Sequence, residues 1–252
     1  MAARKPLIAG NWKMHGRRAD LAEAAALESA AGEALKRLDV LICPPAPYLE
    51  AALAAVAGGA VLVGAQDCSP AAADAARTGE VSAGMLADVG AQYVIVGHSE
   101  RRSLFGETDE TVRQKAEAAQ AAGLTPIVCV GETQAQRDAG QAGAVVAAQV
   151  RASTPAGADR LVVAYEPVWA IGGSRTPTLA EIAEIHSLVR NELISRYGAG
   201  ADGVRVLYGG SVNPKNAGEI FAVDGVDGAL VGRAALKAAD FSAIIKAHPA
   251  AL

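Results

Sequence analysis

Glu166 is the residue of this sequence best placed to act as a general base. It directly follows a short apolar run, Leu161–Tyr165, that is typical of a buried strand, and Pro167 ends that strand because proline lacks a backbone N–H. An apolar segment that runs into Gly172 and Gly173 comes next. A carboxylate at a strand end beside such a flap is shielded from water, as a general base requires, although a strand-end glutamate can also simply cap a helix.

Polar side chains also follow two other predicted strands. In the first strand, Asn11 and Lys13 share a face with the apolar residues before them. In the fourth, His98 shares a face with Val94 and Val96, and the positive end of the helix that follows favours a neutral imidazole. Taken singly, a solvated lysine and a helix-capping histidine are the ordinary interpretations. If the strand ends converge, these side chains meet the carboxylate and form a site.

Two later strands end in glycine, at Gly209-Gly210-Ser211 and at Gly232-Arg233. Glycine lets a ligand approach the backbone closely, and successive N–H groups hold an oxyanion. Gly-Gly pairs also form ordinary turns. Two such loops after the last two strands of an eight-stranded barrel nevertheless indicate a phosphate site.

Three other reactive side chains are interpreted as structural. Arg101 and Arg102 have the spacing of an ordinary ion-pair cluster. Cys129 follows the fifth predicted strand and has no base nearby in the sequence, so we expect a buried packing residue and not a nucleophile.

Strand and helix patterns alternate along the whole chain and would position these residues. Thr178–Tyr197 has the clearest helical periodicity, with a capping box formed by Thr178 and Glu181. The pattern predicts an α/β fold, a (β/α)₈ barrel, with residues 1–252 as a single domain. An open, doubly wound sheet is the alternative, which the lack of a Gly-x-Gly-x-x-Gly motif after the first strand disfavours. The predicted strands are Pro6–Gly10, Val40–Cys43, Ala60–Gly64, Tyr93–Val96, Pro126–Val130, Leu161–Tyr165, Val204–Leu207 and Gly228–Val231.

Composition excludes several classes of protein. Of the 252 residues 51% are apolar, yet no apolar run approaches membrane-spanning length, and the first residues do not resemble a secretory signal. The net charge of −4 argues against general binding to nucleic acid or a membrane surface. Cys43, Cys68 and Cys129 have neither disulfide nor metal-ligand spacing, so we expect a protein of the reduced cytoplasm.

Ordered motifs along nearly the whole chain resemble those of the triosephosphate isomerase family. They are Gly10-Asn11-Trp12-Lys13, Gly64-Ala65-Gln66, Thr78-Gly79-Glu80, Gly97-His98-Ser99-Glu100-Arg101-Arg102, Phe105-Gly106-Glu107, Tyr165-Glu166-Pro167-Val168-Trp169-Ala170-Ile171-Gly172 and Tyr208-Gly209-Gly210-Ser211-Val212. The resemblance implies a TIM barrel that interconverts dihydroxyacetone phosphate and D-glyceraldehyde 3-phosphate through an enediolate, in glycolysis and gluconeogenesis. The acid–base pair and closing loop of this family are standard worked examples of catalysis, so their roles are taken from the resemblance.

The resemblance assigns a role to each matching residue. Glu166 resembles the carbon base, and His98 resembles the neutral electrophile that polarises the carbonyl and moves protons on the enediolate oxygens. Lys13 resembles the cation that stabilises developing negative charge, and Asn11 a residue that positions the ligand. The backbone donors for the phosphate correspond to Gly172, Ser211, Gly232 and Arg233, and supporting residues to Glu100, Gln66 and Thr78. No metal or organic cofactor is implied, because a carboxylate in a dry site can deprotonate a carbon next to a carbonyl.

The sequence departs from the family pattern at two functional positions. Gly173-Ser174-Arg175 stands in the closing loop where the family usually has Thr-Gly-Lys, and we expect the glycine at position 173, next to Gly172, to raise the ordering entropy lost on closure. Arg233 stands where the family usually has a second glycine, so its N–H is available only if its φ is negative or strain is tolerated.

The segment Cys68–Arg77 matches the loop through which the family dimerises. The resemblance therefore implies a homodimer in which Gln66 and Thr78 support the partner's site. Two other functions are the alternatives: an isomerase for a different phosphorylated sugar, and a non-catalytic phosphate binder or dimer scaffold. Short, matched loops disfavour the first, and a carbon base, which binding alone does not need, disfavours the second. We expect a small phosphorylated triose and a second copy of the chain as partners, with no nucleic acid and no membrane.

Overall fold

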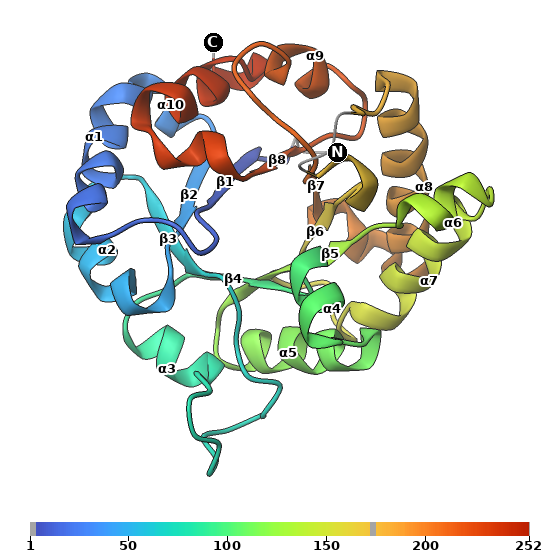
Figure 1. The fold of residues 1–252 in the computed structure, drawn as a ribbon, viewed down its shortest axis with the longest axis horizontal. Coiled ribbons are helices and arrows are strands. Elements are labelled where there is room, and N and C mark those ends of the chain that lie inside the picture. Colours follow the sequence, from blue (N-terminus) through green and yellow to red (C-terminus); the bar gives the residue numbers. More distant parts are fainter. Residues whose placement is uncertain (1–3, 172–174, 252) are drawn as a thin grey trace.

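Eight parallel strands close into a barrel in the order in which they occur along the chain (Figure 1). This computed structural model describes residues 4–171 and 175–251. β1 pairs with both β2 and β8, which confirms the predicted (β/α)₈ barrel and shows that the open-sheet alternative is wrong. The strands are β1 (Leu7–Asn11), β2 (Asp39–Cys43), β3 (Leu62–Ala65), β4 (Tyr93–Val96), β5 (Thr125–Val130), β6 (Val162–Tyr165), β7 (Arg205–Tyr208) and β8 (Gly228–Val231).

Helices surround the barrel on its outside (Figure 1). The α-helices are α1 (Leu21–Ala31), α2 (Leu49–Ala55), α3 (Ala83–Asp88), α4 (Ser99–Phe105), α5 (Asp109–Ala121), α6 (Gln134–Asp138), α7 (Ala142–Ser153), α8 (Leu179–Tyr197), α9 (Ala217–Phe221) and α10 (Ala238–Lys246). Short 3₁₀ helices are η1 (Arg18–Asp20), η2 (Gly32–Lys36), η3 (Ala46–Tyr48), η4 (Val168–Ala170), η5 (Gly198–Gly203), η6 (Arg233–Leu236) and η7 (Pro249–Ala251).

The helix predicted behind Thr178 is α8, and its capping box is present. The Thr178 N–H donates to Glu181 at 2.8 Å, and the Glu181 N–H donates to the Thr178 hydroxyl at 3.2 Å. Asn213 followed by Pro214 is a sequence pattern that predicts a helix start, but this prediction is wrong, because α9 begins only at Ala217. The intervening residues form a turn in which the Asn213 N–H donates to Asn216 Oδ1 at 2.8 Å.

Side-chain alternation divides the apolar residues into two cores. Leu7 and Ala9 of β1 point into the barrel, whereas Ile8 packs against the outer helices. The expected face of β4 is wrong: Val94 and Val96 belong to the outer core, and Tyr93 and Ile95 fill the interior. The next residues still reach the interior, because a glycine after β4 adopts φ 65° and breaks the alternation.

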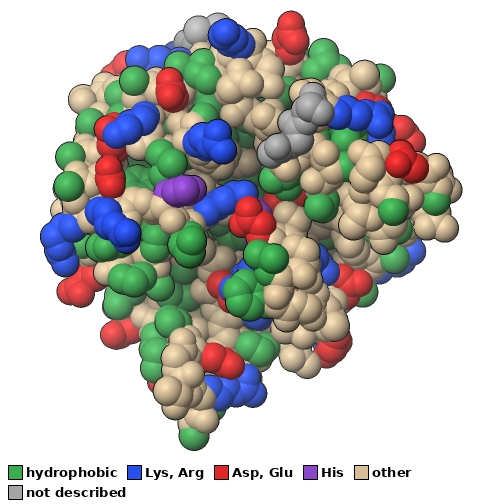
Figure 2. Space-filling model, viewed as in Figure 1, with side chains coloured by type: hydrophobic (Ala, Val, Ile, Leu, Met, Phe, Trp, Pro, Cys, Tyr) green, Lys and Arg blue, Asp and Glu red, His purple; other side chains and the backbone are tan. Residues whose placement is uncertain are grey.

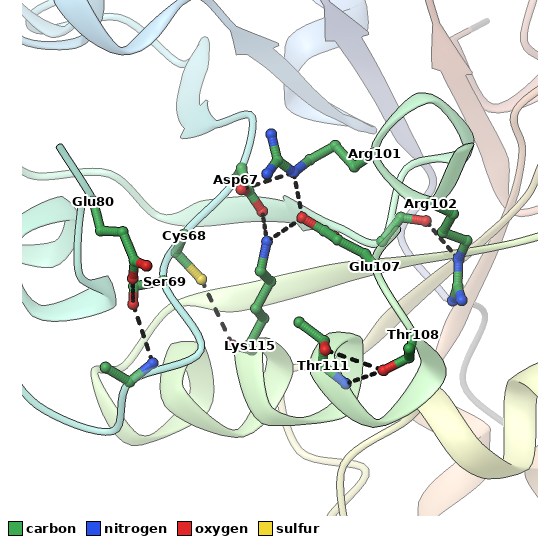
Figure 3. A network of polar contacts seen from close by, with 12 residues as sticks. Asp67, Cys68, Ser69, Glu80, Arg101, Arg102, Glu107, Thr108, Thr111 and Lys115 are labelled. Atoms are coloured by element: carbon green, nitrogen blue, oxygen red, sulfur yellow. Dashed lines mark hydrogen bonds and ion pairs between the residues drawn. The ribbon is translucent and has the colours of Figure 1, made fainter. Parts of the chain in front are cut away.

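A buried ion-pair cluster joins α4 and α5 to the segment after β3. Figure 3 shows Lys115 of α5 between Asp67 and Glu107, with Arg101 of α4 contacting both carboxylates. The Lys115 and Glu107 side chains are only 5% and 6% exposed, so these charges depend on one another and not on water. Arg102 pairs separately with Asp109 at 2.6 Å. The ion-pair interpretation of the two arginines is therefore confirmed.

The interior cysteine Cys129 is fully buried, and burial raises its thiol pKa well above the usual value, as expected of a packing residue. No helix in the described ranges is both long enough and apolar enough to cross a membrane.

His186 of α8 should make the folded state sensitive to acid. Its ring is fully buried, Nδ1 lies 3.1 Å from the Gly225 carbonyl oxygen, and burial lowers its pKa from 6.5 to about 4. As the pH falls below 6.5, His186 therefore becomes protonated in the unfolded chain but stays neutral in the folded chain until the pH approaches about 4. This contribution to the free energy of unfolding is complete above pH 6.5 and is lost as the pH falls toward about 4.

We expect His186→Gln to flatten the pH dependence of urea unfolding between pH 6.5 and 4. Glutamine can still donate to Gly225 but does not titrate. His15→Gln, at an exposed histidine, is the matched control and should keep the wild-type slope. Equal slopes for wild type and His186→Gln would show that His186 is not the titrating group.

Candidate active site

A cavity of about 800 Å³ opens at the carboxyl ends of the strands. Its lining includes most of the residues singled out from the sequence: Asn11, Lys13, His98, Glu100, Glu166, Ser211, Gly232 and Arg233. They come from the ends of β1, β4, β6, β7 and β8, so the barrel joins side chains that are far apart in the sequence. Near the centre of the face in Figure 2, a histidine lies beside basic and acidic side chains, so the surface there carries charge of both signs.

Glu166 directly follows β6, and its side chain is almost completely buried. Ser99 donates to it twice, from its backbone N–H to Oε2 at 2.9 Å and from its hydroxyl to Oε1 at 3.2 Å. His98 Nε2 lies 2.9 Å from Oε1. Burial raises the pKa of this carboxyl, but His98 and the Ser99 donors outweigh burial and lower the pKa overall. The carboxylate is therefore ionised at neutral pH and is able to accept a proton.

His98 is the N-cap of α4, and its Nδ1 accepts the backbone N–H of Glu100 at 3.2 Å. Because Nδ1 is an acceptor, the hydrogen-bond pattern assigns the proton of the neutral ring to Nε2, which donates to Glu166. Burial lowers the pKa of His98, but the Glu166 carboxylate more than offsets this, so the pKa is raised overall. The helix effect expected from the sequence is thus opposed, in this arrangement, by a carboxylate in direct contact.

Lys13 lies just after β1, with its backbone in the left-handed region at φ 51°. This conformation is uncommon for a residue with a side chain and is held by neighbours. Asn11 Oδ1 accepts the Lys13 N–H at 2.9 Å, and Gln66 donates to the Lys13 carbonyl oxygen at 2.8 Å. The Lys13 ammonium is 2.6 Å from Glu100 Oε1. Asn11 and Gln66 therefore fix the backbone from which Lys13 reaches into the cavity.

The side of the cavity assigned to phosphate is formed by the segments after β7 and β8. A Cβ at Gly209 would lie 2.9 Å from Glu166 Cγ, so glycine allows this segment to pack against the base. Arg233 begins η6, and the non-glycine residues with positive φ in the described ranges are Lys13 and Arg160. Arg233 therefore does not have a positive φ, and its backbone N–H is available to a ligand without backbone strain. Gly172 lies outside the described residues.

Comparisons with known proteins agree along almost the full length of the chain. The model of the family described as "Triosephosphate isomerase" matches residues 6–248. The chain belongs to the triosephosphate isomerase family. The triosephosphate isomerase of Afipia carboxidovorans is 58% identical over 247 residues, covering 97% of this chain and 98% of the relative, and that of Xanthobacter autotrophicus is 56% identical over 252 residues, covering 99% of each. The crystal structure of triosephosphate isomerase from Bartonella henselae superposes with a TM-score of 0.88 at 40% identity, covering 96% of this chain and 98% of that one.

Family membership makes the chain an isomerase, and the interconversion of dihydroxyacetone phosphate and glyceraldehyde 3-phosphate expected from the sequence is the reaction of triosephosphate isomerases. No group of three or more histidine, cysteine or acidic side chains in the described part of the chain is arranged to hold a metal ion.

Two supporting residues of the triosephosphate isomerase pattern lie in different surroundings. Gln66 contacts the site, because its amide also donates to the Cys43 carbonyl oxygen at 2.8 Å and so links β2 to Lys13. Thr78 is exposed and does not line the cavity. It belongs to the segment between β3 and α3, which projects from the ring of helices (Figure 1).

Glu132 is a site residue that sequence analysis missed. It is fully buried after β5, and its Oε1 accepts from Trp169 Nε1 at 2.7 Å, Arg137 at 3.0 Å and Tyr165 Oη at 3.1 Å. It therefore anchors η4, the first turn after Glu166. The sequence did contain a signal: Glu132 is a polar residue two positions after the predicted strand Pro126–Val130, as His98 is after Tyr93–Val96.

The beginning and end of the segment that follows η4 are also tied to each other. The Arg175 guanidinium lies 4.6 Å from the centre of the Trp169 ring and 3.1 Å from Glu181 of α8. Gly172, Gly173 and Ser174 lie outside the described residues, so the expectation for loop closure stays a prediction.

Proposed function

We propose that Glu166, His98 and Lys13 carry out the isomerisation of dihydroxyacetone phosphate and D-glyceraldehyde 3-phosphate in this protein. The observation that supports this most strongly is the 2.9 Å contact between Glu166 Oε1 and His98 Nε2 in a cavity that Lys13 also lines. A buried carboxylate beside a neutral donor is suited to moving a proton between adjacent carbons while their oxygens are held.

In the proposed mechanism the Glu166 carboxylate removes a proton from the carbon next to the carbonyl. The electron pair of the broken C–H bond forms a C=C bond, the π pair of the carbonyl moves to its oxygen, and an enediolate results. His98 donates from Nε2 to this oxygen, and the Lys13 ammonium stabilises its negative charge. His98 then takes the proton of the neighbouring hydroxyl as that group becomes the new carbonyl, and Glu166 returns its proton to the other carbon, so both residues regain their starting states. No external oxidant or reductant is needed, so the proposal includes no cofactor.

Substrate must first separate Glu166 from His98. The two side chains now contact each other through Oε1 and Nε2, and both atoms must contact the substrate instead during the reaction. The carboxylate therefore leaves both His98 and Ser99 when it becomes the base. His98 then loses the main group that raises its pKa; burial and Lys13, which lower the pKa, remain, together with the smaller raising effect of Glu100. This sequence of events favours the neutral imidazole that the reaction needs.

We assign the substrate phosphate to backbone N–H groups at Ser211, Gly232 and Arg233, and to Gly172, with Asn11 positioning the ligand. Support comes from the placement of Ser211, Gly232 and Arg233 along the cavity wall at the ends of β7 and β8. Loops at these two positions are the common phosphate site of such barrels.

The test is a coupled assay of the purified wild-type protein with glyceraldehyde 3-phosphate. We expect turnover close to the range of efficient isomerases, without added metal or cofactor. A folded protein that shows no turnover would contradict the proposed reaction.

We also propose that the protein is a homodimer. Met14, Leu104 and Phe105 are large apolar side chains that are 95%, 76% and 67% exposed, which is a substantial amount of apolar surface for one chain to leave in water. The segment from residue 66 to 82 projects from the ring of helices as an arm (Figure 1). Sedimentation velocity should show a dimer at micromolar concentration and a monomer for Met14→Glu. A wild-type monomer under these conditions would refute the dimer.

We further propose that residues 1–252 form a single domain that acts in the cytoplasm on a small phosphorylated triose, without nucleic acid or membrane as partner. Support comes from the three buried free cysteines, which fit a reducing compartment, and from the net charge of −4, which does not attract polyanions.

A further inference from the structure

The charges that line the cavity are poorly suited to a dianion. Two cations, Lys13 and Arg233, face three carboxylates, Glu100, Glu166 and Asp240. Lys13 is already paired with Glu100 at 2.6 Å, so part of its charge is compensated before a ligand arrives. The whole chain is also negative, and its long-range field repels phosphate esters. Attraction must come from a local cation that is still available.

Arg233 is that cation. In the part of the chain that the structure describes, its guanidinium takes part in no ion pair, whereas Lys13 does. It directly follows Gly232, and a Cβ built on Gly232 would lie 3.7 Å from Lys13 Cε. The two cationic residues therefore occupy the same part of the wall, next to the backbone proposed to hold phosphate.

The backbone that carries Arg233 is firmly placed. The Trp12 indole donates to the Ala235 carbonyl oxygen at 3.1 Å, and the Ala235 N–H donates to the Gly232 carbonyl oxygen at 2.9 Å. Ala235 itself is buried against β1, where a Cβ on Gly10 would have no room. η6 is thus fixed to the barrel, and the exposed Arg233 side chain begins from a defined point at the cavity rim.

We infer that the Arg233 guanidinium is a second phosphate-binding group of this site, in addition to its backbone N–H, and that it sets the affinity for dianionic ligands. The inference rests on the proposed function. A guanidinium offers paired donors that match two phosphate oxygens, and it keeps its charge at every working pH. It lies at the phosphate end and not at the reacting carbons, so it stabilises the bound substrate and the transition state equally.

The decisive variants are Arg233→Gln, which removes the charge, and Arg233→Lys, which keeps it. For Arg233→Gln we expect the KM for glyceraldehyde 3-phosphate and the inhibition constant of inorganic phosphate to rise together by about fivefold, with kcat nearly unchanged. Arg233→Lys should recover most of the affinity. The dependence of kcat/KM on ionic strength should be weaker for Arg233→Gln than for the wild type.

Two controls separate phosphate binding from a structural effect. Arg37→Gln removes the same charge from an exposed residue just before β2, at the opposite end of the barrel, and should leave every constant unchanged. Glyceraldehyde, which lacks the phosphate, should react with the same kcat/KM in wild type and Arg233→Gln.

An unchanged phosphate affinity in Arg233→Gln, or an equal loss with glyceraldehyde, would overturn the inference. Calorimetric titration with inorganic phosphate measures binding without turnover. Failure of the proposed isomerase reaction would therefore be seen separately, in the wild-type assay, while phosphate binding still decides the role of Arg233.

Discussion

Replacing Glu166 by glutamine is expected to reduce kcat by about 10³-fold, because general bases typically contribute between 10² and 10⁴. Glutamine has nearly the same size but cannot accept a proton from carbon. Its single oxygen also cannot replace both carboxylate oxygens, which accept from Ser99 and His98, so a modest loss of stability should accompany the change. Steady-state kinetics with glyceraldehyde 3-phosphate, together with thermal unfolding, measure the two effects.

Two further variants, Glu166→Asp and Glu50→Gln, test whether the loss of kcat is specific to the position and charge of the Glu166 carboxylate. Aspartate keeps the charge but withdraws the carboxylate by one methylene, so kcat should fall while the affinity for phosphate is kept. Glu50 is an exposed glutamate of α2, and its change to glutamine should alter neither quantity. If Glu166→Gln kept more than a tenth of the wild-type kcat, another group would have to be the base.

Replacing Lys115 by methionine should lower the free energy of unfolding by about 3 kcal/mol, the cost typical of breaking a buried ion pair from one side. Lys115 Nζ is 2.7 Å from Asp67 and also contacts the nearly buried Glu107 (Figure 3). Arg101 alone would then serve two carboxylates. Glu107 Oε2 already lacks a hydrogen-bond partner in the described structure, so the cluster has no spare donor that could replace Lys115. Urea unfolding at pH 7 measures the loss.

The control is Lys36→Met, which breaks an exposed pair with Glu33 and should change stability by less than about 1 kcal/mol. A second feature identifies the mechanism. Burial raises the pKa of Asp67 and Lys115 lowers it, so without Lys115 this carboxyl takes up a proton more readily in the folded state than in the unfolded chain, and the penalty should shrink as the pH is lowered. A penalty that is the same for both lysines, or independent of pH, would argue against a dependence on buried charge.

Lys115 also matters for the site, although it does not line the cavity. Its cluster includes Arg101 of α4, and α4 begins with Ser99, which binds the Glu166 carboxylate. We therefore expect Lys115→Met to affect kcat as well as stability, through the position of α4.

Strand ends carried most of the information that the sequence held about this site. Apolar runs covered on both faces are readable without a structure, and in a parallel barrel their carboxyl ends must meet, so Glu166 and Lys13 could be placed together. The position of the His98 side chain could not be predicted in the same way. Its position depends on the left-handed backbone of Gly97, which reverses the face on which the chain continues. Alternation alone assigned the outer face of β4 to the interior.

Contacts made by tertiary packing were not readable at all. Ser99 binds Glu166, and Glu132 gathers donors from three segments, but neither relation follows from spacing along the chain. The turn at Asn213 shows a related limit: its Asn-Pro pair suits a helix start equally well, and only the hydrogen bond to Asn216 decides between the two.

Closure of the barrel has a consequence for the synthesis of the protein. β1 finds its second neighbour only in β8, where Leu7 lies beside Gly228, after the seven other strands have been made. Because chains emerge from the ribosome from the N-terminus onward, β1 must wait until β8 has emerged before its last backbone partners arrive. Asn11 ends β1 and Lys13 comes just after it, whereas Gly232 and Arg233 follow β8. A nascent chain therefore cannot acquire this cavity in stages, and the first catalytic event of each molecule would report that its final strand has docked.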